Sequence, residues 1–173
     1  MNLLIIGNIV ALIAASIQFI VGIIKDRKKI IYVQTIQFFA FAISTFILGG
    51  ISGAIANIIG AIRNILSYKE KLTNLAIFFI ILISTILILM FNNLGVIGLL
   101  PLINTIIYTI FINEKNLLKF KILFTITIVF WLIYDIAIKS YASVFFDFFA
   151  ISGSLITTYQ IYKNNKLKNI NNK

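Results

Sequence analysis

The chain of 173 residues contains no cysteine and no histidine, a single proline, and five acidic residues against fifteen basic ones. The lack of cysteine excludes a disulfide framework and thiolate chemistry. The lack of histidine removes the usual general base and the commonest metal ligand. The sequence also has no metal-ligand spacing, nucleophile–base pair or phosphate-binding glycine loop. We therefore expect neither an enzyme nor a cofactor or metal site.

Charge of either sign is scarce, and apolar residues dominate. Hydrophobic residues make up 61% of the chain and charged residues 12%, and the mean hydropathy of +1.06 excludes an ordinary soluble domain. The net charge of +10 is large enough to suggest nucleic acid. The charges lie at the ends of apolar runs, however, where anionic lipid headgroups explain them. We expect a lipid bilayer, and no nucleic acid, as the partner.

Seven apolar segments have about the 20 residues that a helix needs to cross a bilayer. The sequence thus predicts an all-α integral membrane protein with seven transmembrane helices, of which the third and fifth look short. The predicted spans are Leu3–Ile24, Ile30–Leu48, Gly50–Ser67, Leu72–Phe91, Leu94–Ile112, Leu117–Ile138 and Ala142–Tyr162.

The basic residues predict the orientation of these spans. With the N-terminus outside, every lysine and arginine except Lys139 falls on the cytoplasmic side. The flank Met1–Asn2 carries no basic residue and the cluster Lys25–Lys29 follows the first apolar run, so this run is not expected to be a cleaved signal peptide. We expect an outside N-terminus and a cytoplasmic C-terminus.

The alternation of basic and neutral loops predicts one membrane domain, residues 1–162, with a 3+1+3 arrangement of two three-helix bundles and one linking helix. A first three-helix bundle (1–71) and a second (94–162) are joined by a linker helix (72–93), and a basic cytoplasmic tail follows (163–173). The linker helix has no charge inside it and is expected to face lipid. Because one helix joins the bundles, they would be parallel repeats about an axis along the membrane normal.

Amide side chains at membrane depth are the first candidates for a solute path. Asn57 lies in the stretch Gly49–Lys71, whose small residues allow close helix contacts, and Asn104 lies in the fifth span. Gln18, Gln34 and Gln37 are further amides within the spans. Lipid offers no hydrogen bonds, so each amide needs a partner within the bundle or water. Either interhelical hydrogen bonds or a polar cavity would satisfy them.

Two aspartates and one tryptophan complete the candidates. A carboxylate within a span is costly, so Asp135 and Asp147 are unusual. Asp135 is four residues before Lys139 and therefore either pairs with it at the outer surface or faces a cavity. Asp147 has no local partner and is expected to be the charge-selective group. Trp131 belongs to the sequence WLIYD, which suits either stacking of a planar solute or an aromatic belt at the interface.

Two further residues carry expectations about helix geometry and charge. Pro101 is predicted to kink the fifth helix, since proline removes one backbone hydrogen bond. Arg63, near the cytoplasmic end of the third span, is expected to extend to the membrane interface rather than to gate the inner mouth.

Several residues together resemble the YgjV family of bacterial inner-membrane proteins. These are Gln34, Gln37, Phe41, Gly49–Gly50, Ala54, Asn57 and Arg63, followed by Trp131 and Tyr134–Asp135. The organisation of that family is distantly similar to that of SWEET, PQ-loop and PnuC-type transporters. This similarity implies solute movement by alternating access. The chain departs from the sugar-transporter pattern in having one proline only. It also has no amide matching Asn57 in the seventh span, where Ile151, Ser152 and Ser154 occupy the neighbourhood.

We therefore expect a transporter or facilitator of a small polar solute in the bacterial cytoplasmic (inner) membrane. Two alternatives stay open. One is a non-transporting accessory or assembly protein, and the other, weaker, is an intramembrane enzyme with the two aspartates as an acid–base pair. Homo-oligomers are allowed for. The residues expected to line the solute path are Asn57, Asn104, Trp131, Asp135 and Asp147.

Overall fold

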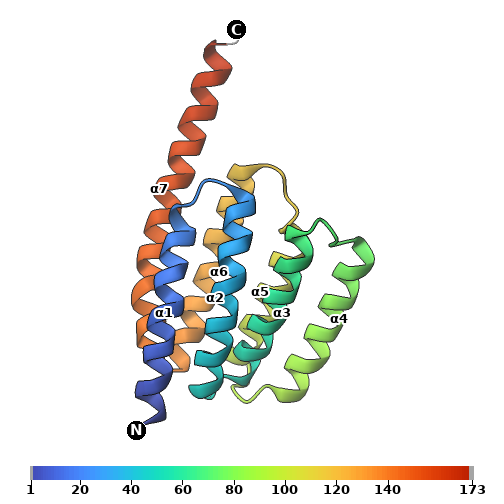
Figure 1. Ribbon diagram of the computed structural model, residues 1–173, viewed down its shortest axis with the longest axis vertical. Coiled ribbons are helices and arrows are strands. Elements are labelled where there is room, and N and C mark those ends of the chain that lie inside the picture. Colours follow the sequence, from blue (N-terminus) through green and yellow to red (C-terminus); the bar gives the residue numbers. More distant parts are fainter. Residues whose placement is uncertain (1, 172–173) are drawn as a thin grey trace.

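The computed structural model describes residues 2–171, and their side chains as far as residue 165. This part of the chain is entirely helical (Figure 1). It has seven α-helices and one 3₁₀ turn, η1. The elements are α1 (Leu3–Ile23), α2 (Arg27–Ile47), α3 (Ile51–Tyr68), α4 (Asn74–Phe91), η1 (Ile97–Leu99), α5 (Leu100–Phe111), α6 (Leu117–Ala137) and α7 (Tyr141–Asn171).

Five of these helices, namely α1, α2, α4, α6 and α7, are long and apolar enough to cross a membrane. The surface agrees with this, since large apolar side chains such as Phe46, Leu75 and Phe148 are exposed along the bundle. Such side chains are stable at a surface that lipid covers. The α3 and α5 helices, which the sequence already marks as short, carry more polar residues and lie against other helices.

The helices pack as a closed ring with one helix outside it. Going round the ring, α1 packs on α2, α2 on α3, α3 on α5, α5 on α6, α6 on α7, and α7 back on α1. The α4 helix packs only on the outer side, against α3 and α5, and buries just Ile80, Ser84 and Ile88. Figure 1 shows it at the edge of the bundle, as expected of a lipid-facing helix.

The two ends of the bundle differ in charge. The α1–α2, α3–α4 and α5–α6 loops lie at one end together with the far end of α7, and Figure 1 shows the N-terminal end of α1 at the other. We call the first end, which carries Lys25, Lys69 and Lys115 in its loops, the basic end. The opposite end carries Lys139.

Several helix boundaries of the first half recur 90 residues later in the chain. The α2 and α6 helices have 21 residues each and begin at residues 27 and 117, while α3 and α7 begin at 51 and 141. The side chains that cap the N-terminal ends of α2 and α6 follow the same spacing. Asp26 accepts a hydrogen bond from the N–H of Lys29, and Asn116 accepts one from the N–H of Lys119.

The turns after α2 and α6 share the shift. Gly49 has φ +81° and Lys139 has φ +58°. In each turn the next residue donates to a carbonyl five positions back, Gly50 to Thr45 at 2.8 Å and Ser140 to Asp135 at 2.9 Å. These bonds form the same helix-ending motif, which needs a left-handed residue. Glycine adopts this conformation without strain, whereas lysine does not.

The fifth and seventh helices differ from the sequence prediction. Pro101 stands in the first turn of α5, where a missing N–H costs nothing, so it starts the helix and does not kink it. The predicted span from Leu94 instead begins with a turn in which Asn92 binds the N–H of Leu94. The α7 helix continues to Asn171, so residues 163–171 of the predicted tail are helical. Residues 172–173 of that tail lie outside the described residues.

Candidate functional site

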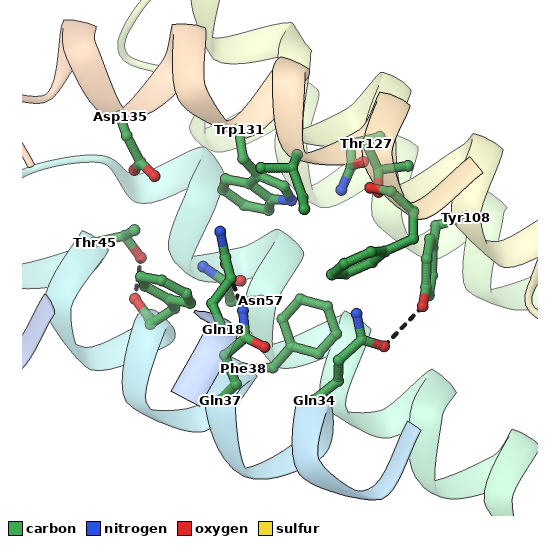
Figure 2. Close-up of a pocket in the computed structure, with 14 residues that line it drawn as sticks. Gln18, Gln34, Gln37, Phe38, Thr45, Asn57, Tyr108, Thr127, Trp131 and Asp135 are labelled. Atoms are coloured by element: carbon green, nitrogen blue, oxygen red, sulfur yellow. Dashed lines mark hydrogen bonds between the residues drawn. The ribbon is translucent and has the colours of Figure 1, made fainter. Parts of the chain in front are cut away.

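A cavity lies inside the ring of helices, and side chains from α1, α2, α3, α5 and α6 line it (Figure 2). The space open to the centre of a water molecule is about 30 Å³, enough for roughly two waters. The cavity is therefore nearly closed in this conformation. Its lining residues are Gln18, Gln34, Gln37, Phe38, Phe41, Thr45, Asn57, Asn104, Tyr108, Phe124, Thr127, Ile128, Trp131 and Asp135.

One face of α2 supplies much of this wall. Gln34, Gln37, Phe38, Phe41 and Thr45 recur at intervals of three or four residues, which places them on the same side of the helix. That face is mixed, with two amides followed by two aromatic rings and a hydroxyl. Figure 2 shows Gln34, Gln37 and Phe38 of this face on the opposite side of the cavity from Trp131 and Thr127 of α6.

Asp135 and Thr45 mark one end of the cavity, as Figure 2 shows. Asp135 is 3% exposed and lies two residues before Ala137, the last residue of α6. Just beyond it, the hydroxyl of Tyr134 accepts a hydrogen bond from the N–H of Gly53 at 2.9 Å and lies 3.2 Å from the hydroxyl of Ser52. A Cβ atom at Gly53 would come within 3 Å of the Tyr134 ring. This contact, the Tyr134 clamp, ties α6 to the start of α3.

Asp147 lies behind the cavity wall. One of its carboxylate oxygens accepts a hydrogen bond from the amide of Gln18, whose own carbonyl oxygen accepts one from the amide of Gln37 at 2.6 Å. Gln18 and Gln37 both line the cavity, but Asp147 does not. Asp147 is therefore linked to the cavity through a chain of two hydrogen-bonded amides.

Several buried polar atoms around the cavity have no hydrogen-bond partner among the described residues. Such atoms normally find a partner, since an unpaired buried polar group is costly. Here they come from five side chains on five helices. Four of these helices, α2, α3, α5 and α6, surround the cavity, and α7 lies behind it. The atoms are Gln37 Oε1, Asn57 Nδ2, Asn104 Oδ1, Asp135 Oδ1 and Asp147 Oδ2.

A second contact closes the cavity toward the basic end. The hydroxyl of Tyr108 donates to Gln34 Oε1 at 2.7 Å, as drawn in Figure 2. Arg63 packs on this pair, with its guanidinium carbon 4.4 Å from the centre of the Tyr108 ring and 5.5 Å from that of Phe38. Arg63 is buried and its guanidinium donates to Asn64 Oδ1. The expectation that it extends to the interface is wrong, because aromatic stacking holds it inside the bundle.

Two more cations are used to cap helices. Lys121 of α6 is fully buried and donates to the carbonyl of Gly22 at 2.7 Å, near the end of α1. Arg27 of α2 donates to the carbonyl of Ile112 at the end of α5. Gly22 and Ile112 are 90 positions apart, so the two capped carbonyls correspond to each other, whereas the cations Arg27 and Lys121 do not occupy corresponding positions. Cations at helix C-termini are favourable because these carbonyls lack partners within the helix.

The remaining charges near the loops form one surface pair. Within residues 2–165, the single salt bridge joins Lys28 and Glu70 at 2.8 Å. The hydrogen bond and the positive charge of Lys28 lower the pKa of the Glu70 carboxyl. Asp135 and Lys139 do not pair, and Lys139 is exposed while Asp135 is buried. The left-handed backbone at Lys139 ends α6 there and takes the lysine off the helix face that a four-residue spacing assumes.

The structure brings four of the five residues proposed from the sequence to one cavity, namely Asn57, Asn104, Trp131 and Asp135. Asp147 contacts the cavity only through Gln18. Sequence reasoning did not select Tyr108, because a tyrosine in an apolar run carries no signal of its own. Its position 90 residues after Gln18 would have been informative.

The chain was also compared with known proteins. Residues 5–165 match the Imp-YgjV family, described as a bacterial inner membrane protein. No curated protein and no solved structure matches. The match covers nearly all of the chain and agrees with its apolar helices. This protein therefore belongs to the Imp-YgjV family of bacterial inner membrane proteins.

Proposed function

We propose that this protein moves a small polar solute across the inner membrane through the cavity enclosed by its ring of helices. One observation carries the proposal: unpartnered polar atoms from helices distant in the sequence meet at a single cavity. Polar groups at membrane depth are expensive and tend to mark solute or ion paths. A protein whose helices only hold a partner protein has no need for such a cavity. We therefore favour transport over the accessory role.

The two closures support movement by alternating access. The Tyr134 clamp closes one end of the cavity, and the Tyr108–Gln34 hydrogen bond with Arg63 closes the other. Each closure joins helices that are distant in the sequence, α6 with α3 and α5 with α2. A cavity with room for about two waters corresponds to an occluded state. Opening one closure at a time would expose the cavity to one side only.

The proposal includes the 3+1+3 arrangement and the orientation. The 90-residue shift supports two parallel three-helix bundles, with α4 as the linker, in a manner similar to SWEET-type repeats. The basic end is assigned to the cytoplasm, since cytoplasmic loops carry excess lysine and arginine. Reporter fusions after residues 2 and 165 test this, and finding both in the same compartment would contradict it.

Transport itself is tested in liposomes containing the folded protein. The panel spans amines, nucleosides and sugars, so the test does not depend on the charge of the solute. We expect uptake of at least one class, and its loss in Asn104→Leu, which removes a cavity amide. Ser152→Ala is the matched control, because Ser152 is exposed. Absence of uptake for every class, in protein with an unchanged melting temperature, would favour the accessory role.

A further inference from the structure

The unpartnered atoms at the cavity are mostly hydrogen-bond acceptors. Four of the five are oxygens, namely those of Gln37, Asn104, Asp135 and Asp147, and two of these belong to carboxylates. An aspartate carboxylate can accept about four hydrogen bonds and donates none when ionised. The cavity thus lacks donors rather than acceptors. A ligand that satisfies it must bring several N–H or O–H donors.

The cavity also lacks positive charge. Neither aspartate has a salt-bridge partner among the described residues. The two buried cations on neighbouring helices are engaged elsewhere, Lys121 with the carbonyls that end α1 and Arg63 with Asn64. Arg63 does not line the cavity, and it lies on the rings of Phe38 and Tyr108, which do. A buried charge without a partner is strongly destabilising, so a cationic ligand would relieve it.

The rest of the wall suits an organic cation better than a metal ion. Phe38, Phe41, Phe124 and Trp131 line the cavity beside Asp135. Aromatic faces attract ammonium groups and cover the hydrocarbon part of such a ligand. A bare alkali cation would gain little from these rings.

We propose that the cavity binds a monovalent organic cation, a protonated amine, through the carboxylate of Asp135. Asp147 supports this site from behind the wall, through its hydrogen-bonded link to Gln18 and Gln37. This assignment rests on the proposed function and names the solute class. It also places the first contact at Asp135, the aspartate that lines the cavity, instead of at Asp147.

The test uses the fluorescence of Trp131, which is the one tryptophan of the chain and lines the cavity. The full chain in nanodiscs is titrated with phenethylammonium, with neutral 2-phenylethanol and with anionic phenylacetate, which share the phenyl group and differ in charge. A fourth titration replaces potassium by sodium at constant ionic strength. We expect a saturable change with phenethylammonium alone.

Substitutions at Asp135 test whether its carboxylate provides the negative charge that binds the ammonium. Asp135→Asn should weaken binding roughly 10- to 100-fold, the effect of losing a hydrogen bond to a charged group. Asp135→Glu keeps the charge and should bind within a few-fold of the original chain, which separates charge from folding. The matched control is Asp26→Asn, since Asp26 is exposed and asparagine also caps a helix N-terminus. It should bind as the original chain does.

Three results would overturn the inference: binding of the alcohol as tight as that of the ammonium, unchanged affinity in Asp135→Asn, or a response to sodium with none to the ammonium. No response to any probe would overturn it as well. The liposome assay tests transport independently of amine binding, so the two proposals can fail separately. Uptake of a neutral solute with no amine binding removes this inference and leaves transport standing, whereas amine binding without uptake of any solute removes transport alone.

Discussion

The α2 and α6 helices, and the starts of the helices that follow them, lie 90 residues apart in the chain and carry different chemistry. Under the 90-residue shift, Asn57 of α3 corresponds to Asp147 of α7, and Thr45 of α2 corresponds to Asp135 of α6. The first half thus places an amide and a hydroxyl where the second half places two carboxylates. As the sequence indicated, α7 has no amide that matches Asn57, and the residue at the corresponding position, four residues before Ile151, is an acid.

The comparison shows which properties are fixed by the backbone and which by single side chains. Caps and left-handed turns recur in both halves, so helix ends and directions are shared. The acidic side of the cavity comes from the second half alone. In such a repeat, one half can bind the ligand while the other half stabilises the fold. Exchanging side chains between corresponding positions tests this division.

The largest effect is expected from making the first half acidic. Asn57→Asp adds a third carboxylate at the cavity, and Asn57 is 2% exposed. We expect a loss of about 2.5–3.5 kcal/mol in the free energy of unfolding, the cost of a carboxylate at membrane depth. Thermal or denaturant unfolding in detergent measures it. The reverse exchange, Asp147→Asn, should cost much less, and equal losses in both would contradict the division between the halves.

A smaller effect is expected at the Tyr134 clamp, which the first half does not have. Tyr134→Phe removes the hydroxyl that binds the N–H of Gly53 and leaves that buried donor without a partner. We expect a loss of about 1–3 kcal/mol in the free energy of unfolding. The residue at the corresponding position is Ser44, which donates to the carbonyl of Gly7 at 2.9 Å. Ser44→Ala is the matched variant, and a larger loss there would contradict the clamp.

The smallest effect is expected at the turns. Lys139 has φ +58° where its counterpart Gly49 has φ +81°. Lys139→Gly should therefore raise the free energy of unfolding by about 1 kcal/mol, and Gly49→Ala should lower it by a similar amount. Opposite signs of the two shifts in melting temperature check this. A loss at both positions would show that the lysine side chain contributes more than its backbone costs.

Sequence reasoning recovers the local features of this fold and misses the distant ones. Apolar runs gave the ends of α1 and α6 to within one residue, and the glycine pair gave the turn after α2. A hydropathy scale gives the free-energy cost of moving each residue into lipid. It contains no information on the residues with which a side chain forms hydrogen bonds or stacks. Lys121 finds the carbonyl of Gly22, 99 positions away, and Arg63 finds the Tyr108 ring. For that reason the sequence placed Lys121 on the cytoplasmic side and Arg63 at the membrane interface.

The same limit applies to the cavity. Amides and aspartates at membrane depth could be identified as candidates, since they are rare there. Their order around the cavity could not, because it depends on how α2 and α6 face each other. Asp147 was ranked above Asp135 since Asp135 had a lysine at helical spacing. The left-handed turn at Lys139, which no periodicity reveals, reversed that order.

The crossed caps at the basic end have a consequence for how the chain can be divided. Arg27 of the first half holds the end of α5, and Lys121 of the second half holds the end of α1. Each half therefore supplies the side chain that caps the C-terminal end of a helix in the other half. Two fragments separated within the loop after α3 should find each other when produced together and copurify, and neither should be stable when produced alone.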